Sequence, residues 1–389
     1  MTKGIFPIDC FKDIETPFYY YDIKLLRETL DKVVELTKNK PFVVHYALKA
    51  NANERILNEI AEYGFGADCV SGNEIVKALE AGISSSNIVF AGVGKSDKEI
   101  NVGLDSNIFC FNVESIAEIE VINELATKKG KVAPIAIRIN PNVDARTHKY
   151  ITTGLDDNKF GINEQDIPRT LDAIEKADNV KLIGLHFHIG SQITDMTSFE
   201  NLCVKVNELQ HRFKEKGIEL PIINVGGGLG VNYQHPNHFP IADFESYFKV
   251  FENHLVLDEG QALHFELGRS IVAQSGSLIS RVLYEKGGIN KRFLIIDAGM
   301  TELIRPALYQ AYHKIENISS SDEEAVYDVV GPICESSDTF GEDVTINSSK
   351  RGDFIAVRSA GAYGESMASQ YNCRNLPKSY FSDNIYCDK

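Results

Sequence analysis

Short apolar runs alternate with amphipathic segments along residues 43–267. The apolar runs are rich in β-branched and aromatic residues, which is typical of strands buried on both faces of a sheet. The segments between them, such as "ERILNEIAEYG" and "FENLCVKVNELQHRFKEKG", repeat their apolar residues with the period of an amphipathic helix. The strands that this pattern predicts lie at 43–48, 65–70, 87–92, 108–113, 133–140, 181–189, 222–228 and 262–267.

Strands that alternate with helices predict a parallel sheet, and eight of them are the number that closes a (β/α)8, TIM-like barrel. An open, doubly wound sheet is the competing architecture. It is disfavoured because no predicted strand is followed by the G-x-G-x-x-G turn of a dinucleotide-binding fold.

The pattern changes after residue 270, where strand-like stretches such as "SLISRVLYEK" and "DFIAVRSAGAYG" are joined by loops rather than by regular helices. The early stretch "PFYYYD" is also strand-like and can join these later strands. The sequence therefore predicts a barrel domain over 24–268 and a separate, mostly-β domain built from 1–23 and 269–389.

The charge and cysteine content limit the kinds of partner. A formal net charge of -15 leaves no broad basic surface for nucleic acid or an anionic membrane, so an anionic substrate needs a few placed arginines. The seven cysteines are scattered without CxxC spacing, which favours reduced thiols. The amino-terminal "MTKGIFPIDC" lacks an apolar core of signal-peptide length, and no run reaches transmembrane length. We expect a soluble, cytoplasmic protein.

Polar residues stand at the ends of several predicted barrel strands, where barrel enzymes carry their active sites. They are Lys49, Asp68, Ser71, Arg138, His188, Glu266 and the glycines at 226–228. Lys49 alone could be a lysine that extends from a strand end into water, or an amine kept for covalent chemistry such as a Schiff base. The gathering of polar groups on one rim favours the second interpretation.

Three of these features have ordinary explanations beside the functional ones. The run "NVGGGLGVN" offers backbone amides to a phosphate, but it can also be a tight turn. His186 and His188 in "HFHIGSQ" resemble a metal pair without a partner at ligand-like spacing, so His188 is better explained as stacking on a flat cofactor or as a core histidine. Glu266 and Arg269 form an ion pair, or hold a cofactor ring nitrogen and an anionic group respectively.

These motifs together resemble the diaminopimelate decarboxylases, which are pyridoxal-phosphate (PLP) enzymes of the alanine-racemase-like fold type. The resemblance covers roughly residues 17–372 in family order. One departure is Leu267, where the family commonly has proline, and it changes no reacting group. The matching stretches are "YALKAN", "GFGADCVSGNE", "RINPNV", "THKYITTG", "KFGI", "HFHIGSQ", "VGGGLG", "ELGRSIVA", "DAGMTELIRPALYQAYH", "VVGPICESSDTF" and "GAYGESMASQYN".

The resemblance implies a PLP site. Lys49 would hold the cofactor as a Schiff base, His188 would stack on its ring, and Glu266 would keep the ring nitrogen protonated. Asp68 and Arg138 would orient these groups. The residues that would surround the cofactor phosphate are Ser191, Gly226, Gly227, Gly228, Gly268, Arg269 and Tyr363.

The resemblance also implies how the substrate is bound. Cys334 would be the proton donor, although a cysteine is more commonly a small buried hydrophobe. Glu335 would contact the far ammonium group and Arg305 the far carboxylate. Tyr309, Arg269 and Tyr363 complete the substrate-binding set. The implied reaction converts meso-diaminopimelate to L-lysine and CO2, the last step of lysine biosynthesis, in a homodimer whose active site is shared between protomers.

Other functions remain open on the same residues. A decarboxylase of ornithine, lysine or carboxynorspermidine has the same fold, but Arg305 would then be a buried charge without a ligand. A racemase needs a base on each face of the substrate, and it is disfavoured because Cys334 is the only obvious second acid–base group in the sequence. A non-catalytic homologue that binds a partner protein would be expected to have lost Lys49, Cys334 or the glycine run, and all three are present.

Overall fold

The structure is a computed structural model of the chain, and it describes residues 4–141 and 159–385. The chain divides into two compact units. The barrel unit comprises Leu30–Gly230 and Asp243–Gly268, and the β unit comprises Met1–Thr29, Val231–Ala242 and Arg269–Lys389. The domain bounds expected from the sequence stay a prediction. In the division found here, residues 231–242 belong to the β unit.

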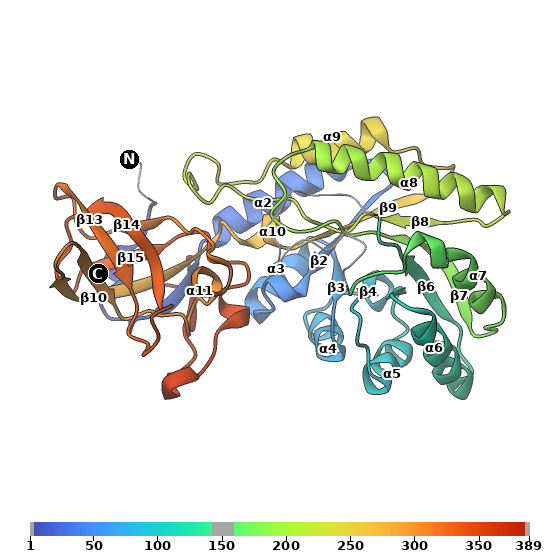
Figure 1. Cartoon of the computed structure of the whole chain (residues 1–389), viewed down its shortest axis with the longest axis horizontal. Helices are drawn as coiled ribbons and strands as arrows, with labels where there is room; N and C mark the ends of the chain where they lie inside the picture. The colour runs from blue at the N-terminus through green and yellow to red at the C-terminus, as the bar shows by residue number, and fades with distance from the viewer. Residues whose placement is uncertain (1–3, 142–158, 386–389) are drawn as a thin grey trace. The chain divides into compact units, whose positions relative to one another are not determined.

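The strands of the barrel unit form a closed parallel barrel (Figure 1). Each strand pairs with the next along the chain, and the last pairs with the first, so the predicted barrel is confirmed. The pairing leaves no free sheet edge. The strands are β2 (Phe42–Ala47), β3 (Gly66–Cys69), β4 (Ile88–Phe90), β5 (Cys110–Val113), β6 (Ala133–Arg138), β7 (Val180–His186), β8 (Ile222–Asn224) and β9 (Ala262–Leu267).

Helices surround the barrel, and several of them begin at a side chain that caps the helix. Ser71 and Ser115 each accept a hydrogen bond from a backbone amide of the first turn, and Ser96 forms a capping box with Glu99. The helices are α2 (Ile23–Thr37), which enters from the β unit, α3 (Glu54–Glu62), α4 (Gly72–Glu80), α5 (Asp97–Ser106), α6 (Ile116–Lys129), α7 (Ile167–Glu175), α8 (Thr197–Glu215) and α9 (Phe244–His254). The 3-10 turns in the described part of this unit are η1 (Leu48–Ala50), η2 (Ser85–Asn87) and η3 (Glu164–Asp166).

The interior of the barrel contains polar side chains. Asn112 on β5 reaches Glu266 on β9, and because these two strands are not neighbours, the bond crosses the interior. Two residues earlier on the same face of β9, His264 bonds His45 of β2, with 2.8 Å between the ring nitrogens. Two inward-facing positions on one strand therefore both carry polar groups with partners.

The β unit is built on a mostly antiparallel sheet. Its main strand order is β12-β15-β10-β11-β13-β14, and β1 pairs with β10 and with β16. The prediction that the amino-terminal strand joins the carboxyl-terminal ones is therefore confirmed. The strands are β1 (Phe18–Tyr21), β10 (Gly276–Gly287), β11 (Arg292–Ile296), β12 (Ile315–Asn317), β13 (Glu324–Val330), β14 (Thr339–Asn347), β15 (Phe354–Val357) and β16 (Lys378–Phe381). Short helical pieces are α1 (Ile8–Phe11), α10 (Arg269–Val272), α11 (Arg305–Tyr309), η4 (Glu365–Met367) and η5 (Tyr371–Cys373).

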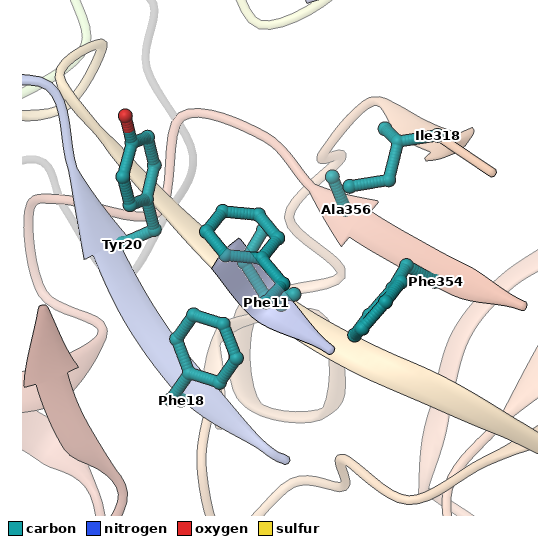
Figure 2. Close-up of a cluster of buried hydrophobic side chains, with 7 residues drawn as sticks. Phe11, Phe18, Tyr20, Ile318, Phe354 and Ala356 are labelled. Atoms are coloured by element: carbon teal, nitrogen blue, oxygen red, sulfur yellow. The ribbon is translucent and has the colours of Figure 1, made fainter. Parts of the chain in front are cut away.

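Aromatic side chains build a core of the β unit around Phe11, which is fully buried (Figure 2). Its ring packs edge-on against the rings of Phe18 and Tyr20, with 5.2 Å between ring centres in each case, and against Phe354, with 6.0 Å between ring centres. These partners lie on β1 and β15, so α1 packs against both strands. The packing joins the amino-terminal segment to the carboxyl-terminal sheet.

The cysteine prediction is only partly met. Among the described residues the free thiols are Cys69, Cys110, Cys203, Cys334 and Cys373. Cys10 is disulfide-bonded, so the expectation of reduced thiols is wrong for this residue. Cys387, and the family motif at 147–154, lie outside the described residues. No helix within 4–141 and 159–385 has the length and apolarity to cross a membrane.

Truncation of Phe11 tests this core. We expect Phe11→Ala to lower the free energy of unfolding by about 3–5 kcal/mol, because it removes a fully buried ring and its edge contacts. Phe11→Leu keeps most of the apolar volume and is expected to cost about 1–2 kcal/mol. Urea unfolding followed by circular dichroism gives both values, and equal losses in the two variants would contradict the packing described.

Candidate active site

Lys49 lies in η1, directly after β2, at the carboxyl-terminal rim of the barrel. Its side chain is 40% exposed, and its Nζ is 3.6 Å from the Oδ2 of Asp68 at the end of β3. The pairing of β2 with β3 brings the two residues together, because Ala47, two residues before Lys49, is the register partner of Asp68. The structure therefore joins the predicted lysine to the predicted aspartate.

The Asp68 carboxylate is fully buried, and neither of its oxygens has a hydrogen-bond partner among the residues that the structure describes. Burial and the nearby charge of Glu266 raise the pKa of Asp68 to about 7, although Lys49 acts in the opposite direction. A buried carboxylate without donors is costly in a finished core. It is the kind of group that a ligand with a donor or a positive charge completes.

Glu266 is the centre of a hydrogen-bonded network inside the barrel. Its Oε1 accepts from the amide nitrogens of Asn112 at 3.0 Å and Asn224 at 2.7 Å. Its Oε2 lies 3.0 Å from the Nε2 of His186. The three donors come from β5, β8 and the end of β7, so four strands fix one carboxylate.

This network favours the ionised form of Glu266. Burial acts to raise the pKa of this carboxyl, but the charge and hydrogen bond of His186, with the charge of Lys49, lower it overall. His186 is therefore engaged with Glu266 rather than paired with His188 around a metal. Within 4–141 and 159–385, no group of three or more histidine, cysteine or acidic side chains could hold a metal ion.

His188 follows β7 and is half-buried at the rim. Its Nδ1 accepts a hydrogen bond from the backbone amide of Gly227 at 3.3 Å. Burial and the charges of Lys49 and Arg138 hold its pKa well below the usual range of histidine. The side chain is thus a neutral, flat ring beside the glycine run.

The glycine run follows β8 and packs too closely for any side chain. A Cβ on Gly227 would lie 1.9 Å from the backbone oxygen of Glu266, and one on Gly226 would lie 2.4 Å from the oxygen of Phe187. Gly226 and Gly228 also have φ values of 68° and 112°, in the left-handed region. The tight-turn explanation therefore holds for this segment, and it is compatible with backbone amides that bind an anion.

Arg138, at the end of β6, is held by a residue that the sequence did not identify. Its Nη1 donates to the Oε1 of Glu114 at 2.8 Å, and its guanidinium lies 4.7 Å from the ring centre of Phe160. Glu114 also accepts from the backbone amides of Gly92 and Gly161. Arg138 is therefore fixed at the rim by a buried ion pair.

The remaining predicted residues of the barrel unit lie near this group. Ser191 is half-buried in the loop after β7. Gly268 directly follows β9, and a Cβ there would lie 3.0 Å from the Cβ of Ala50 and 3.1 Å from that of Ala47. Gly268 therefore allows the end of β9 to pack against the segment that carries Lys49.

In the β unit, Arg269 and Tyr363 lie together. The Arg269 guanidinium is 4.9 Å from the centre of the Tyr363 ring, and its Nη1 donates to the hydroxyl of Tyr233 at 2.7 Å. Arg305 and Tyr309 are the first and last residues of α11, and Arg305 is 6.0 Å from the ring of Tyr363. The structure brings the two predicted arginines to one tyrosine.

Cys334 and Glu335 form a separate part of the β unit, and both are exposed. The Cys334 backbone amide donates to the Oδ1 of Asn372 at 3.3 Å, and the Glu335 carboxylate accepts from the hydroxyl of Tyr371 at 2.6 Å. The buried-hydrophobe explanation for Cys334 is therefore wrong. These two hydrogen bonds connect Cys334 and Glu335 to the 371–372 segment.

Several residues that hold the predicted groups were not foreseen from the sequence. They are Asn112, Glu114, Asn224, Tyr233 and His313. A signal existed for Asn112, which interrupts the apolar run "IFCFNV" at a position that must face inward. Tyr233 and His313 stand in segments without periodicity, and only the fold brings them to the arginines.

Known proteins resemble this chain over nearly its whole length. The family model for the pyridoxal binding domain of pyridoxal-dependent decarboxylases matches residues 25–273. The diaminopimelate decarboxylase of Bacteroides thetaiotaomicron is 61% identical over 384 residues, which are 98% of this chain and 100% of that protein. The crystal structure of the diaminopimelate decarboxylase of Helicobacter pylori, complexed with L-lysine, has a TM-score of 0.91 at 44% identity and covers 96% of this chain and 93% of that chain.

The Asp68 carboxyl provides a test of the site in the ligand-free protein. Its pKa of about 7 lies above the ordinary value of about 3.9 expected for the unfolded chain. The folded protein therefore holds this proton more tightly, and the contribution of this carboxyl to wild-type stability falls as the pH rises from about 4 to about 7. Asp68→Asn has no proton to lose, so its stability relative to wild type should increase between pH 5 and pH 8.

Urea unfolding at the two pH values measures this difference. Asp13→Asn makes the same change at an exposed aspartate and is the matched control for the substitution itself. A stability difference between Asp68→Asn and wild type that is the same at pH 5 and pH 8 would contradict the raised pKa.

Proposed function

The chain belongs to the diaminopimelate decarboxylases, within the pyridoxal-dependent decarboxylases, and from this we propose that it converts meso-diaminopimelate to L-lysine and CO2. The observation that carries the proposal is the 61% identity to a diaminopimelate decarboxylase over 98% of the chain. The L-lysine in the related crystal structure agrees with lysine as the product.

The residues at the barrel rim suit pyridoxal phosphate. The ionised Glu266 carboxylate already accepts three hydrogen bonds, and a carboxylate has room for about one more, which a ring N–H can supply. No residue in the described part of the chain donates a hydrogen bond to the Asp68 oxygens. The flat, neutral His188 ring suits stacking, and the glycine amides suit a phosphate.

In this proposal Lys49 holds the cofactor through its ε-amine, and Glu266 keeps the cofactor's ring nitrogen protonated. The bound cofactor supplies a ring that accepts the electron pair left when the bond to CO2 breaks, and it does so best when its nitrogen is protonated. Asn112, Asn224 and His186 keep Glu266 ionised and in place. Asp68, next to Lys49, is the acidic group best placed to hold or release a proton near the amine.

Arg269 and Tyr363 of the β unit, with Ser191, Gly268 and the glycine run of the barrel unit, are the proposed phosphate-binding residues. The Arg269 guanidinium is oriented by the hydroxyl of Tyr233, so its position does not depend on the ligand alone. A guanidinium binds a phosphate or carboxylate with two parallel hydrogen bonds. Arg269 and Tyr363 are also proposed to contact the substrate.

The far end of the substrate carries an ammonium and a carboxylate, and the β unit has a group for each. Glu335 suits the ammonium, and Arg305, with Tyr309 on the same helix turn, suits the carboxylate. A substrate such as ornithine has no far carboxylate, so it would leave Arg305 as a buried charge without its ligand. This difference favours meso-diaminopimelate over simple diamino acids.

Cys334 is the proposed donor of the proton that replaces CO2 on the substrate carbon. We infer that it acts in a homodimer, where the Cys334 segment of one protomer completes the barrel site of its partner. The exposure of Cys334 and Glu335 supports this, because both side chains face away from the core of their own unit. The Cys334 backbone amide and the Glu335 carboxylate both bond to the 371–372 segment, which gives the exposed groups a defined place.

Release of CO2 by the purified protein with added PLP tests the reaction. We expect release from meso-diaminopimelate, with an equal amount of L-lysine, and little from ornithine, lysine or arginine, since these lack a far carboxylate for Arg305. Release from ornithine at a comparable kcat/KM would keep the decarboxylation and overturn the assignment of Arg305.

Mixing two inactive variants tests Lys49, Cys334 and the shared site together. Lys49→Ala should lose the visible absorbance of the bound cofactor and all turnover, and Cys334→Ala should keep the absorbance and lose most turnover. In a random mixture half of the dimers pair one variant with the other, and one of their two sites has both residues. We therefore expect about one quarter of the wild-type rate after mixing and re-association.

No recovery in the mixture would contradict a site shared in this way. Wild-type turnover by Lys49→Ala alone would contradict its role as the amine that holds the cofactor, and loss of bound cofactor from Cys334→Ala would indicate a structural role for the thiol.

A further inference from the structure

Arg305 is a buried arginine whose nearest partners are neutral. Its exposed fraction is 6%, and its Nε donates to the Nε2 of His313 at 3.3 Å. The largest electrostatic effects on it come from Tyr233, Arg269, Tyr363 and Tyr309, none of which is a carboxylate. Among the residues that the structure describes, Arg305 therefore has no ion-pair partner.

His313 can accept the hydrogen bond from Arg305 because its own protonation is fixed. Its Nδ1 lies 2.9 Å from the backbone oxygen of Arg358, which can only accept, so Nδ1 carries the hydrogen. Burial and the charge of Arg305 lower the pKa of His313 to about 3, so the ring is neutral near pH 7. Its Nε2 lone pair must then point to a donor, and Arg305 Nε is that donor.

Tyr233 packs against both members of this pair. Its ring meets the His313 ring edge-on, with 5.1 Å between centres and planes at 80°, and the Arg305 guanidinium lies 5.7 Å from its centre. The hydroxyl of the same residue accepts from Arg269. Tyr233 comes from residues 231–242, so this segment, which follows the barrel's glycine run in sequence, supplies a wall of the arginine site.

A guanidinium can bind a carboxylate side-on, through Nε and one terminal nitrogen, or end-on, through its two terminal nitrogens. The bond to His313 occupies Nε, and no hydrogen bond of Nη1 or Nη2 is recorded within 4–141 and 159–385. We propose that His313 is a positioning residue that commits Arg305 to end-on binding of the substrate's far carboxylate. The proposal rests on the function proposed above and adds a residue that sets substrate selection.

The reaction's own product provides a probe for this contact. L-lysine keeps the carboxylate at the centre that does not react, which is the one assigned to Arg305. Cadaverine has the same carbon chain and both amines but no carboxylate. The inhibition constant of L-lysine divided by that of cadaverine therefore reports the carboxylate contact. A change in the site that weakens both inhibitors equally leaves this ratio unchanged.

Two substitutions of His313 separate its two hydrogen bonds. His313→Gln can place an amide oxygen near the position of Nε2 and keep an acceptor for Arg305, while it loses the donor to Arg358. His313→Asn can keep the donor near the position of Nδ1 and lose the acceptor. We expect His313→Asn to raise the ratio, and the KM for meso-diaminopimelate, by about tenfold or more, as for the loss of a hydrogen bond to a charged group. His313→Gln should stay within about threefold of wild type, and kcat should change less than KM in both variants.

The outcomes are distinct. A rise in the ratio for His313→Asn but not for His313→Gln supports the proposal. Equal changes in both variants, or a larger change in His313→Gln, would show that the bond to Arg358 matters and would overturn it. A wild-type enzyme that releases no CO2 from meso-diaminopimelate would overturn the proposed function and this inference with it, whereas an active wild type with an unchanged ratio in His313→Asn overturns this inference alone.

Tyr233 supplies a second pair of variants if His313→Asn does not fold. Tyr233→Phe keeps the ring that packs on Arg305 and His313, and Tyr233→Leu removes it. Both variants lose the hydroxyl that accepts from Arg269, so Tyr233→Phe is the matched control, and we expect the ratio to be about threefold or more higher in Tyr233→Leu than in Tyr233→Phe. The same ratio in both would contradict the role of this packing in holding Arg305.

Discussion

One buried carboxylate constrains the barrel and its chemistry together. Glu266 is 7% exposed, and an ionised carboxylate at such a place is tolerated only with hydrogen-bond donors. Asn112, Asn224 and His186 provide them from three other strands. The register of those strands must therefore be correct for the charge to be stable, since a one-residue slip would turn the donors outward. In this way the pairing that closes the barrel also fixes the charge that the proposed cofactor needs.

The fold was predictable where burial leaves a strong pattern in sequence. Strands covered on both faces are continuously apolar, so each barrel strand could be found within a few residues. The predicted strand at 222–228 extended too far, because β8 ends at Asn224 and the glycines belong to the turn after it. In the β unit, β12, β14 and β16 were not foreseen. The first is only three residues long, and the second, "TFGEDVTIN", carries acidic residues and a glycine that are uncommon in strands.

The candidate site was predictable only in part, for a related reason. Lys49 and Glu266 stand at strand ends, and a barrel brings all such ends to one rim whatever the loops do. His313 and Tyr233 reach Arg305 and Arg269 only through the tertiary structure of the β unit, and the spacing of these residues along the chain contains no sign of it. Neutral partners are especially hard to foresee, because histidine and tyrosine have many ordinary places in a core.

Neutral partners nevertheless have a clear physical use at this site. A carboxylate beside Arg305 would stabilise the buried charge but would compete with the carboxylate of a ligand, so binding would have to break an ion pair first. His313 instead accepts one hydrogen bond from the Nε of Arg305 and leaves the net charge of Arg305 uncompensated. Glu266 shows the converse arrangement, with asparagine amides providing two of its three hydrogen bonds. In both cases the protein orients a buried charge without neutralising it fully. Keeping that charge buried costs folding free energy, and a ligand of opposite charge recovers this cost when it binds.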